Sequence, residues 1–220
     1  MLTKIELCPS KFRYIRRELS GKSVKVLDIG CGNNSPTLTK YWLPGAHYSG
    51  ADIQRYNNTD ADIAAIDEFY PVGVDGSGYE AIPPANFDLI ILNHVVEHMS
   101  APLPIVATLC SKLKPGGYIW IAFPSARTLS FPPGESSLHF CDDDSHIYVP
   151  DVREISNILL ANGVKVLRAG RSREFLRVVI GLLRYPKAVL HRLRTGRYSA
   201  GLWHLYGFED HVLGQRKFSE

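Results

Sequence analysis

Compact apolar runs separated by amphipathic segments form the main pattern of the chain. Val24–Ile29 and Phe87–Leu92 are typical of strands that are buried on both faces. Further strands are predicted over His47–Ile53, Asp60–Ile63, Tyr118–Phe123, Val164–Leu167 and parts of Leu202–Lys217, around Tyr206–Phe208 and His211–Leu213. Helical spacing predicts helices over Lys11–Leu19, Pro36–Leu43, Pro104–Leu113 and Pro150–Asn162. Because strands alternate with helices, we expect an α/β fold whose strands pair mostly in parallel through right-handed crossovers.

Length and composition indicate one globular unit. The chain has 220 residues, of which 45% are hydrophobic and 21% charged, so we expect a single domain over residues 1–220. No apolar stretch approaches the length of a membrane span, and the first residues lack the apolar core of a signal peptide, which predicts a cytoplasmic location. The four cysteines stand far apart without CxxC spacing, so they predict neither a zinc site nor a disulfide framework.

A glycine loop follows the first buried strand and carries the clearest chemical signal. The strand delivers Asp28 just ahead of Gly30, Cys31, Gly32 and Asn33, and the two glycines allow a ligand to lie directly on the backbone. A carboxylate at this point suits a ligand that carries an ammonium group. It would repel the pyrophosphate of a dinucleotide, and Ser35 occupies the third glycine position of that fingerprint.

Four segments in the right order resemble the motifs of the class I S-adenosylmethionine-dependent methyltransferases, in their small-molecule branch. These are the glycine loop, the strand ending at Asp52-Ile53, the Phe87–His98 segment and the Leu113-Lys114-Pro115-Gly116-Gly117 turn, which together span residues 24–124. The resemblance implies a three-layer α/β sandwich on a doubly wound seven-stranded sheet with an antiparallel last strand. It also implies S-adenosylmethionine as the cofactor. The cofactor-binding residues that it implies are Asp28, Gly30, Cys31, Gly32 and Asn33 in the loop, Asp52 and Ile53 at the ribose, Asp62 at the adenine, and Asn93 and His94 after the fourth strand.

The acceptor is predicted to be a small molecule, a saccharide or a lipid-linked hydroxyl, and the reaction O-methylation. Asn93-His94-Val95-Val96 lacks the Pro-Pro-aromatic pattern of amino-methylating nucleic-acid enzymes, so we expect no nucleic-acid partner. His98, His139 and His146 are candidate bases because imidazole titrates near neutrality. Residues 138–146 hold two histidines around three aspartates and could instead bind a divalent metal or cap a helix. We favour acid or base chemistry there and expect no metal.

A basic insertion at about residues 171–202 separates the last two predicted strands. Residues 165–197 contain ten basic residues and one acidic residue, and two short amphipathic helices broken at Pro186 are predicted within them. Such helices can lie on anionic membranes, so residues 173–197 predict peripheral contact with the inner membrane surface. A lid or dimer face with solvated arginines is the alternative. Two other functions stay open: a nucleotide-dependent oxidoreductase, and a non-catalytic docking module that retains the methyltransferase fold.

Overall fold

A seven-stranded sheet organises the computed structural model, which describes residues 8–55, 57–133, 138–172, 175–196 and 202–218. The strands lie in the order β3-β2-β1-β4-β5-β7-β6, and only β7 runs antiparallel to its neighbours. Their bounds are β1 Val24–Ile29, β2 Ala46–Asp52, β3 Glu68–Pro71, β4 Phe87–Asn93, β5 Leu113–Pro124, β6 Val164–Arg171 and β7 Glu209–Arg216. The predicted fold class, a mostly parallel sheet with an antiparallel last strand, is confirmed.

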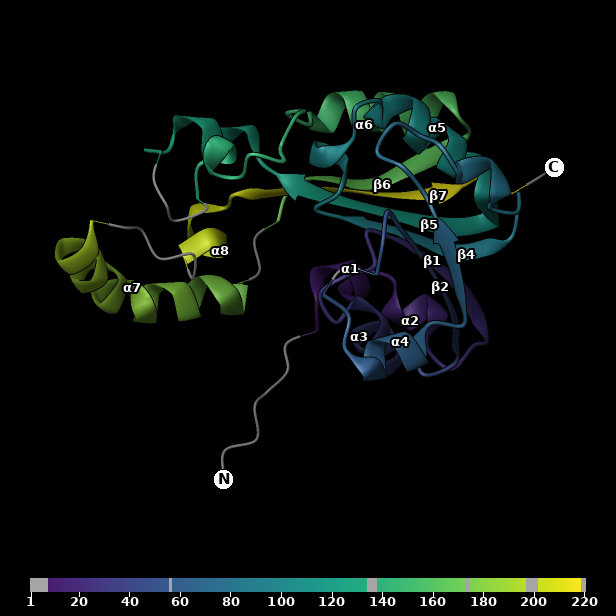
Figure 1. Cartoon of the computed structure of the whole chain (residues 1–220), viewed down its shortest axis with the longest axis horizontal. Coiled ribbons are helices and arrows are strands. Elements are labelled where there is room, and N and C mark those ends of the chain that lie inside the picture. The colour runs from purple at the N-terminus through teal and green to yellow at the C-terminus, as the bar shows by residue number, and fades with distance from the viewer. Residues whose placement is uncertain (1–7, 56, 134–137, 173–174, 197–201, 219–220) are drawn as a thin grey trace.

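Helices cover both faces of the sheet and produce three layers (Figure 1). One layer contains α5 and α6, and the other contains α1 to α4. The bounds are α1 Ser10–Arg13, α2 Arg16–Leu19, α3 Ser35–Trp42, α4 Asp60–Ala65, α5 Pro102–Lys112, α6 Val152–Ala161, α7 Phe175–Thr195 and α8 Trp203–Tyr206, with short 3-10 turns at Tyr79–Ala81, Val96–His98, Ala126–Ser130 and Phe140–Asp142. The turns at Val96–His98 and Phe140–Asp142 belong to the site described below.

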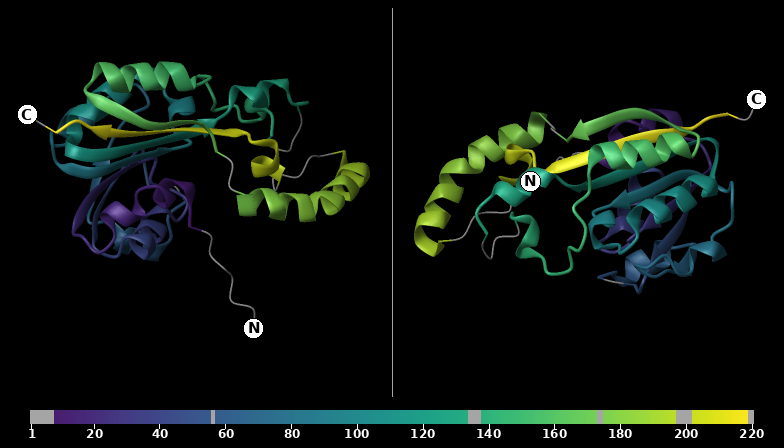
Figure 2. Two further views of the ribbon diagram at one scale, coloured as in Figure 1. Left: turned by 180° about the vertical axis from the view of Figure 1, so that it is seen from behind. Right: turned by 90° about the horizontal axis from the view of Figure 1, so that it is seen from above.

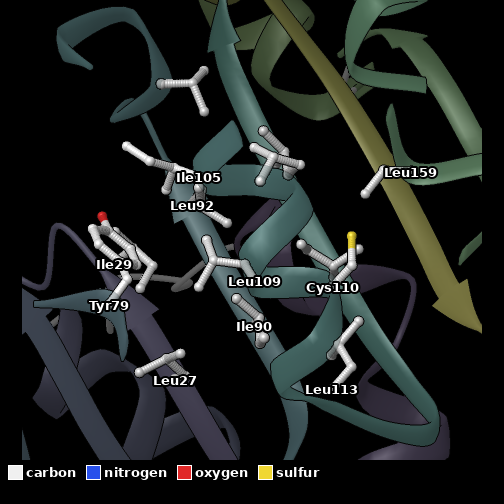
Figure 3. Close-up of a cluster of buried hydrophobic side chains, with 14 of the residues drawn as sticks. Leu27, Ile29, Tyr79, Ile90, Leu92, Ile105, Leu109, Cys110, Leu113 and Leu159 are labelled. Carbon is white, nitrogen blue, oxygen red and sulfur yellow. The ribbon is translucent and has the colours of Figure 1, made fainter. Parts of the chain in front are cut away.

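Side chains that alternate along the strands pack into two separate hydrophobic clusters, one on each face of the sheet. Leu27 and Ile29 of β1 point to the α5–α6 layer, where Leu109 of α5 packs against them in one cluster (Figure 3). Their neighbour Val26 points the opposite way and joins the cluster under the N-terminal helices, which includes Trp120 of β5. Because both faces are covered, the central strands are apolar throughout, which explains the uninterrupted runs in the sequence.

Three local predictions were wrong. Asp60–Ile63 is not a strand but lies in α4, because Thr59 and Asp62 form a capping box that starts a helix there. Tyr206 belongs to α8 and not to a strand. The predicted pair of short helices around Pro186 is the single helix α7, which contains Pro186 in its interior.

α7 lies between β6 and β7, at the place of the predicted insertion, and stands off from the end of the sheet in all three views (Figures 1 and 2). Residues 173–174 and 197–201 of that segment lie outside the described residues. Among the described helices, none combines the length and the apolar character needed to cross a membrane. That the whole chain is one domain stays a prediction.

Candidate active site

A cavity of about 990 Å³ lies at the carboxyl ends of β1, β2 and β4. The sheet order reverses between β1 and β4, and ligands of open α/β sheets bind at such a switch point. Its volume is at the upper end of the roughly 300–1,000 Å³ typical of ligand pockets. The cavity can therefore hold a cofactor and a second molecule.

The glycine loop forms one wall through a backbone that few side chains tolerate. Gly30 has a φ of +72°, and a Cβ there would lie 2.4 Å from a methyl group of Val95. Asn33 and Asn34 also adopt positive φ values of 53° and 63°. Asparagine tolerates this region better than most residues, so the loop turns sharply from β1 into α3 and leaves its backbone next to the cavity.

Asp28 is buried under this loop and is already hydrogen-bonded. Its Oδ2 accepts hydrogen bonds from the Ser35 hydroxyl at 2.5 Å and from the Tyr48 hydroxyl at 2.8 Å. The Lys11 ammonium donates to the Ser35 hydroxyl and lies 3.8 Å from the same carboxylate oxygen. Burial, together with the Asp28 charge, raises the pKa of Tyr48, so the phenol stays protonated and donates. Asp28 therefore holds the loop in place and, with Lys11, presents opposite charges at one end of the cavity.

Asp52 ends β2 at the neighbouring wall and is more open. Its Oδ1 accepts a hydrogen bond from the Ile53 amide at 2.7 Å, and the buried Tyr79 lies on the same cavity. Burial, opposed by hydrogen bonds from the Ile53 and Gln54 amides, raises the pKa of Asp52. This carboxylate is a two-oxygen acceptor placed for a pair of hydroxyl donors.

His94 lies between two carboxylates deeper along the cavity. Its Nδ1 is 3.3 Å from Glu97 Oε1, and its Nε2 is 3.2 Å from Glu209 Oε2. Burial lowers the pKa of His94, but the carboxylates of Glu209 and Glu97 outweigh it and raise the pKa to about 10. Contact with His94 in turn outweighs the burial of Glu209 and lowers its pKa. The ring is therefore an imidazolium at neutral pH, with one-third of the side chain exposed.

The three candidate bases line the cavity in different hydrogen-bonding states. Both ring nitrogens of His139 are used, since Nδ1 accepts from the Cys141 amide and Nε2 lies 3.2 Å from the Leu129 carbonyl. His146 Nδ1 lies 2.7 Å from the Phe140 carbonyl, and His98 Nδ1 lies 3.1 Å from the Ser145 carbonyl. The Ser145 hydroxyl also lies 3.0 Å from His98 Nδ1, and it donates its own proton to Asp143, so it accepts from the ring. Because a carbonyl only accepts, these contacts place a proton on Nδ1, and in a neutral ring the lone pair of His98 and of His146 is then at Nε2.

Most of the predicted site residues come together in this cavity. The residues that line it are Asp28, Gly30, Gly32, Asn33, Asp52, Ile53, Asn93, His94, His98, His139 and His146. Cys31 and Asp62 do not line it. Cys31 faces the core, where its sulfur would lie 2.7 Å from a Cβ on Gly50. The oxygens of Asp62 are taken by Thr37 and Thr59, which place it in helix capping instead of at an adenine.

Sequence reasoning missed several residues of the site. Lys11 and Glu209 belong to no motif, and each reaches the cavity from an element distant in the sequence. Glu97 stands in the Glu-His pair of the fourth motif, so its place in the turn that follows a buried strand was a usable signal.

The strand order, the antiparallel last strand and an Asp-x-Gly-x-Gly loop at the switch point define a Rossmann-like methyltransferase fold. The comparison with protein families agrees: residues 6–169 match the family model of a methyltransferase domain, and the chain belongs to that family. The resemblance to the class I S-adenosylmethionine-dependent methyltransferases is thereby confirmed as membership of the family.

Curated relatives are ubiquinone biosynthesis O-methyltransferases. The protein of that name from Paraburkholderia phytofirmans is 30% identical over 131 residues, which cover 57% of this chain and 55% of the relative. The one from Nitrosococcus oceani is 26% identical over 152 residues, covering 65% and 63%. The chain thus matches a little over half the length of these relatives.

Solved structures share the fold. A S-adenosylmethionine-dependent methyltransferase from Archaeoglobus fulgidus aligns with a TM-score of 0.59 at 17% identity, over 92% of this chain and 91% of that one. A putative methyltransferase from Haloferax volcanii, in complex with the Trm112 activator, aligns with a TM-score of 0.67 at 13% identity, over 94% and 89%.

The residues present fit S-adenosylmethionine. The cavity combines a backbone-lined loop, a carboxylate and an ammonium group at one end, and a half-buried carboxylate at the next strand end. These groups match the amino acid part and the ribose of the cofactor in charge and hydrogen bonding.

Proposed function

We propose that this protein transfers a methyl group from S-adenosylmethionine to an oxygen atom of a small-molecule, saccharide or lipid-linked acceptor. The observation that carries the proposal is one cavity in which the Asp28 and Asp52 carboxylates occupy one half and a cluster of histidines the other. The names of the curated relatives favour oxygen as the methylated atom. Their acceptor is not carried over, because the chain matches only part of their length.

Cofactor binding is proposed to fall to the residues of the first half. Asp28 and Lys11 would face the ammonium and carboxylate of the cofactor's amino acid part, and the backbone of Gly30 and Gly32 would lie against it. Asp52 would accept from the ribose hydroxyls, with Ile53 beside it. Asn33, Asn93 and His94 complete this proposed set. When bound, the cofactor supplies an electrophilic methyl group on a sulfonium.

Acceptor activation is proposed to fall to the histidine half. Methyl transfer is an in-line displacement, so the walls align the acceptor and exclude water. Among His98, His139 and His146, only His98 and His146 have an Nε2 that makes no described hydrogen bond, which favours them as the group that takes the hydroxyl proton; the Asp143 carboxylate lies 3.7 Å from Nε2 of His146. His94 is already protonated and is suited to stabilising negative charge as it develops on the oxygen.

Calorimetry with both forms of the cofactor tests the proposal. S-adenosylmethionine and S-adenosylhomocysteine should each bind the full chain at one site, and turnover with hydroxyl-bearing acceptors should release S-adenosylhomocysteine. A thermal shift with a dinucleotide, and none with S-adenosylhomocysteine, would favour an oxidoreductase. Folded protein that binds neither cofactor form would leave the non-catalytic docking module.

We also propose that α7 docks on an anionic membrane surface, with the protein otherwise in the cytoplasm. Phe175, Leu183 and Leu193 are 77–79% exposed, whereas Gly181 and Ala188 on the other side of the helix face the protein. Basic side chains extend along the same helix: Arg184, Lys187, Arg192 and Arg194. An exposed apolar face combined with basic residues suits a layer of anionic lipid headgroups.

The position of α7 relates this surface to the cavity. Arg177, near its N-terminal end, lies 3.0 Å from His204, and both side chains line the cavity. A lipid-linked acceptor held at α7 would therefore be close to the histidine half.

Vesicle co-sedimentation tests the docking. Wild-type protein should sediment with phosphatidylglycerol vesicles and much less with phosphatidylcholine vesicles. Leu183→Glu should abolish sedimentation, and Leu160→Glu, a change at an exposed leucine of α6, should leave it intact. Equal sedimentation of the two variants would refute membrane contact through α7, and a lid or dimer face would then explain the helix.

A further inference from the structure

The histidine half of the cavity holds a cluster with the features of a metal site. Glu97 and His98 come from the turn after β4, and His146 comes from the segment after Phe140–Asp142. Each offers one ligand atom, and these atoms all lie within 4.8 Å of one another. The rings of His98 and His146 are 4.8 Å apart between centroids.

Glu97 is the independent observation that points to a ligand. Its side chain is fully buried, and neither carboxylate oxygen has a hydrogen-bond partner among the described residues. Within the part of the chain that the structure describes, its one ion-pair partner is His94, whose Nδ1 lies 3.3 Å from Oε1 and whose Nε2 contacts Glu209. A buried carboxylate with an unused oxygen is costly unless a cation or a donor satisfies it.

The two histidines are oriented as metal-binding histidines usually are. In both rings Nδ1 contacts a backbone carbonyl, of Ser145 for His98 and of Phe140 for His146. Such a contact fixes the tautomer and leaves Nε2 as the ligand atom. His139 lies in the same cavity but uses both nitrogens, so it has no lone pair to offer.

Charge on this wall favours a cation. The carboxylates of Glu97 and Glu209 flank His94 at 3.3 Å and 3.2 Å, and the carboxylate of Asp143 also lines the cavity. Asp143 Oδ2 lies 3.7 Å from His146 Nε2, beside the cluster. Negative charge therefore exceeds positive charge where the three ligand atoms meet.

We propose that Glu97, His98 and His146 bind one divalent transition-metal ion such as Zn²⁺ or Mn²⁺. One coordination position would stay open toward the cavity. Two imidazoles and one carboxylate favour such ions over Mg²⁺ or Ca²⁺, which prefer oxygen ligands alone. The binding site does not require methyl transfer. Its role does rest on the proposed function: an acceptor hydroxyl at the open position would lose its proton more readily. While the metal is bound, the Nε2 atoms of His98 and His146 would be ligands, so the metal would take over their proposed role in activating the hydroxyl, and the hydroxyl proton would pass to water.

Zinc binding to the full chain tests the proposal. Protein dialysed against a chelator should take up one Zn²⁺ per chain, measured by competition with a chromophoric chelator, and Co²⁺ should produce a visible absorption band. His146→Gln and Glu97→Gln should each weaken binding at least about tenfold. His139→Gln is the matched control and should bind like wild type. Excess Mg²⁺ should not displace the zinc.

Two results would overturn the site: wild type that takes up no zinc, or His139→Gln and His146→Gln that lose it equally. If Glu97→Gln fails to fold, His146→Gln, a change in a chain segment outside the sheet, decides the question alone. Cofactor calorimetry on the same samples separates the two proposals. Zinc uptake without cofactor binding refutes methyl transfer and keeps the metal site, and the reverse result refutes the metal site only.

Discussion

Asp52 is the best place to test the cofactor half of the cavity, because its side chain is accessible and supports little else. Its described hydrogen bonds are with the amides that follow it, so removal of the carboxylate leaves the sheet unchanged. A hydrogen bond to a charged acceptor contributes roughly 1.5–3 kcal/mol. If the two ribose hydroxyls both donate to Asp52, Asp52→Ala should lose at least about 3 kcal/mol, which raises the Kd for S-adenosylhomocysteine about 100-fold. Asp52→Asn keeps one acceptor oxygen, so its Kd for S-adenosylhomocysteine should lie between the values for wild type and Asp52→Ala.

Calorimetry across pH sharpens this test. Because burial raises the pKa of Asp52, the carboxylate takes up a proton at a higher pH than an ordinary aspartate. Cofactor affinity should therefore fall as the pH drops through that raised pKa, and Asp52→Asn should lack this component. Asp60→Asn, at an exposed aspartate of α4, is the control and should bind like wild type. Unchanged affinity in Asp52→Ala would refute the ribose assignment while leaving the Asp28 end untested by that variant.

Three further predictions concern stability and titration. Leu159→Ala, at a fully buried position of α6, should cost about 2–5 kcal/mol in urea unfolding, whereas Leu160→Ala, on the exposed side, should cost under about 0.5 kcal/mol. Glu209→Gln removes one of the two carboxylates that hold the pKa of His94 near 10 against burial, so NMR titration should show a lower His94 pKa. In wild type, the contribution of the charged His94 to the free energy of unfolding should be complete below about pH 6.5 and should be lost as the pH rises through about 10. His211 should affect the free energy of unfolding in the opposite direction, because burial lowers its pKa. Unfolding should therefore become easier as the pH falls below about 6.5, and His211→Phe should remove that acid sensitivity.

Where the fold could be predicted, the signal was local. Each central strand is apolar on both faces because helices cover both sides of the sheet, and Val24–Ile29 and Phe87–Leu92 carry that pattern without reference to any other segment. Where prediction failed, a second local signal competed with the first. Thr59 and Asp62 have the spacing of a capping box, which outweighs the short apolar pattern and places Asp62 at a helix start.

The half of the site that could be predicted follows the same rule, since Asp28, Gly30 and Asp52 sit at strand ends that the sequence marks by itself. The other half depends on pairs that no spacing connects. Glu209 helps to raise the pKa of His94 although it is 115 residues away in the sequence. The two side chains meet because β7 inserts between β5 and β6. His146 meets Glu97 because the backbone amides of Ile147 and Tyr148 donate to the Glu97 carbonyl and draw the loop against the turn after β4. A histidine in such a loop can therefore be interpreted as a base or a metal ligand only when its partners in the fold are known. When a partner holds the proton on Nδ1, Nε2 is the atom that can accept a proton or bind a metal ion.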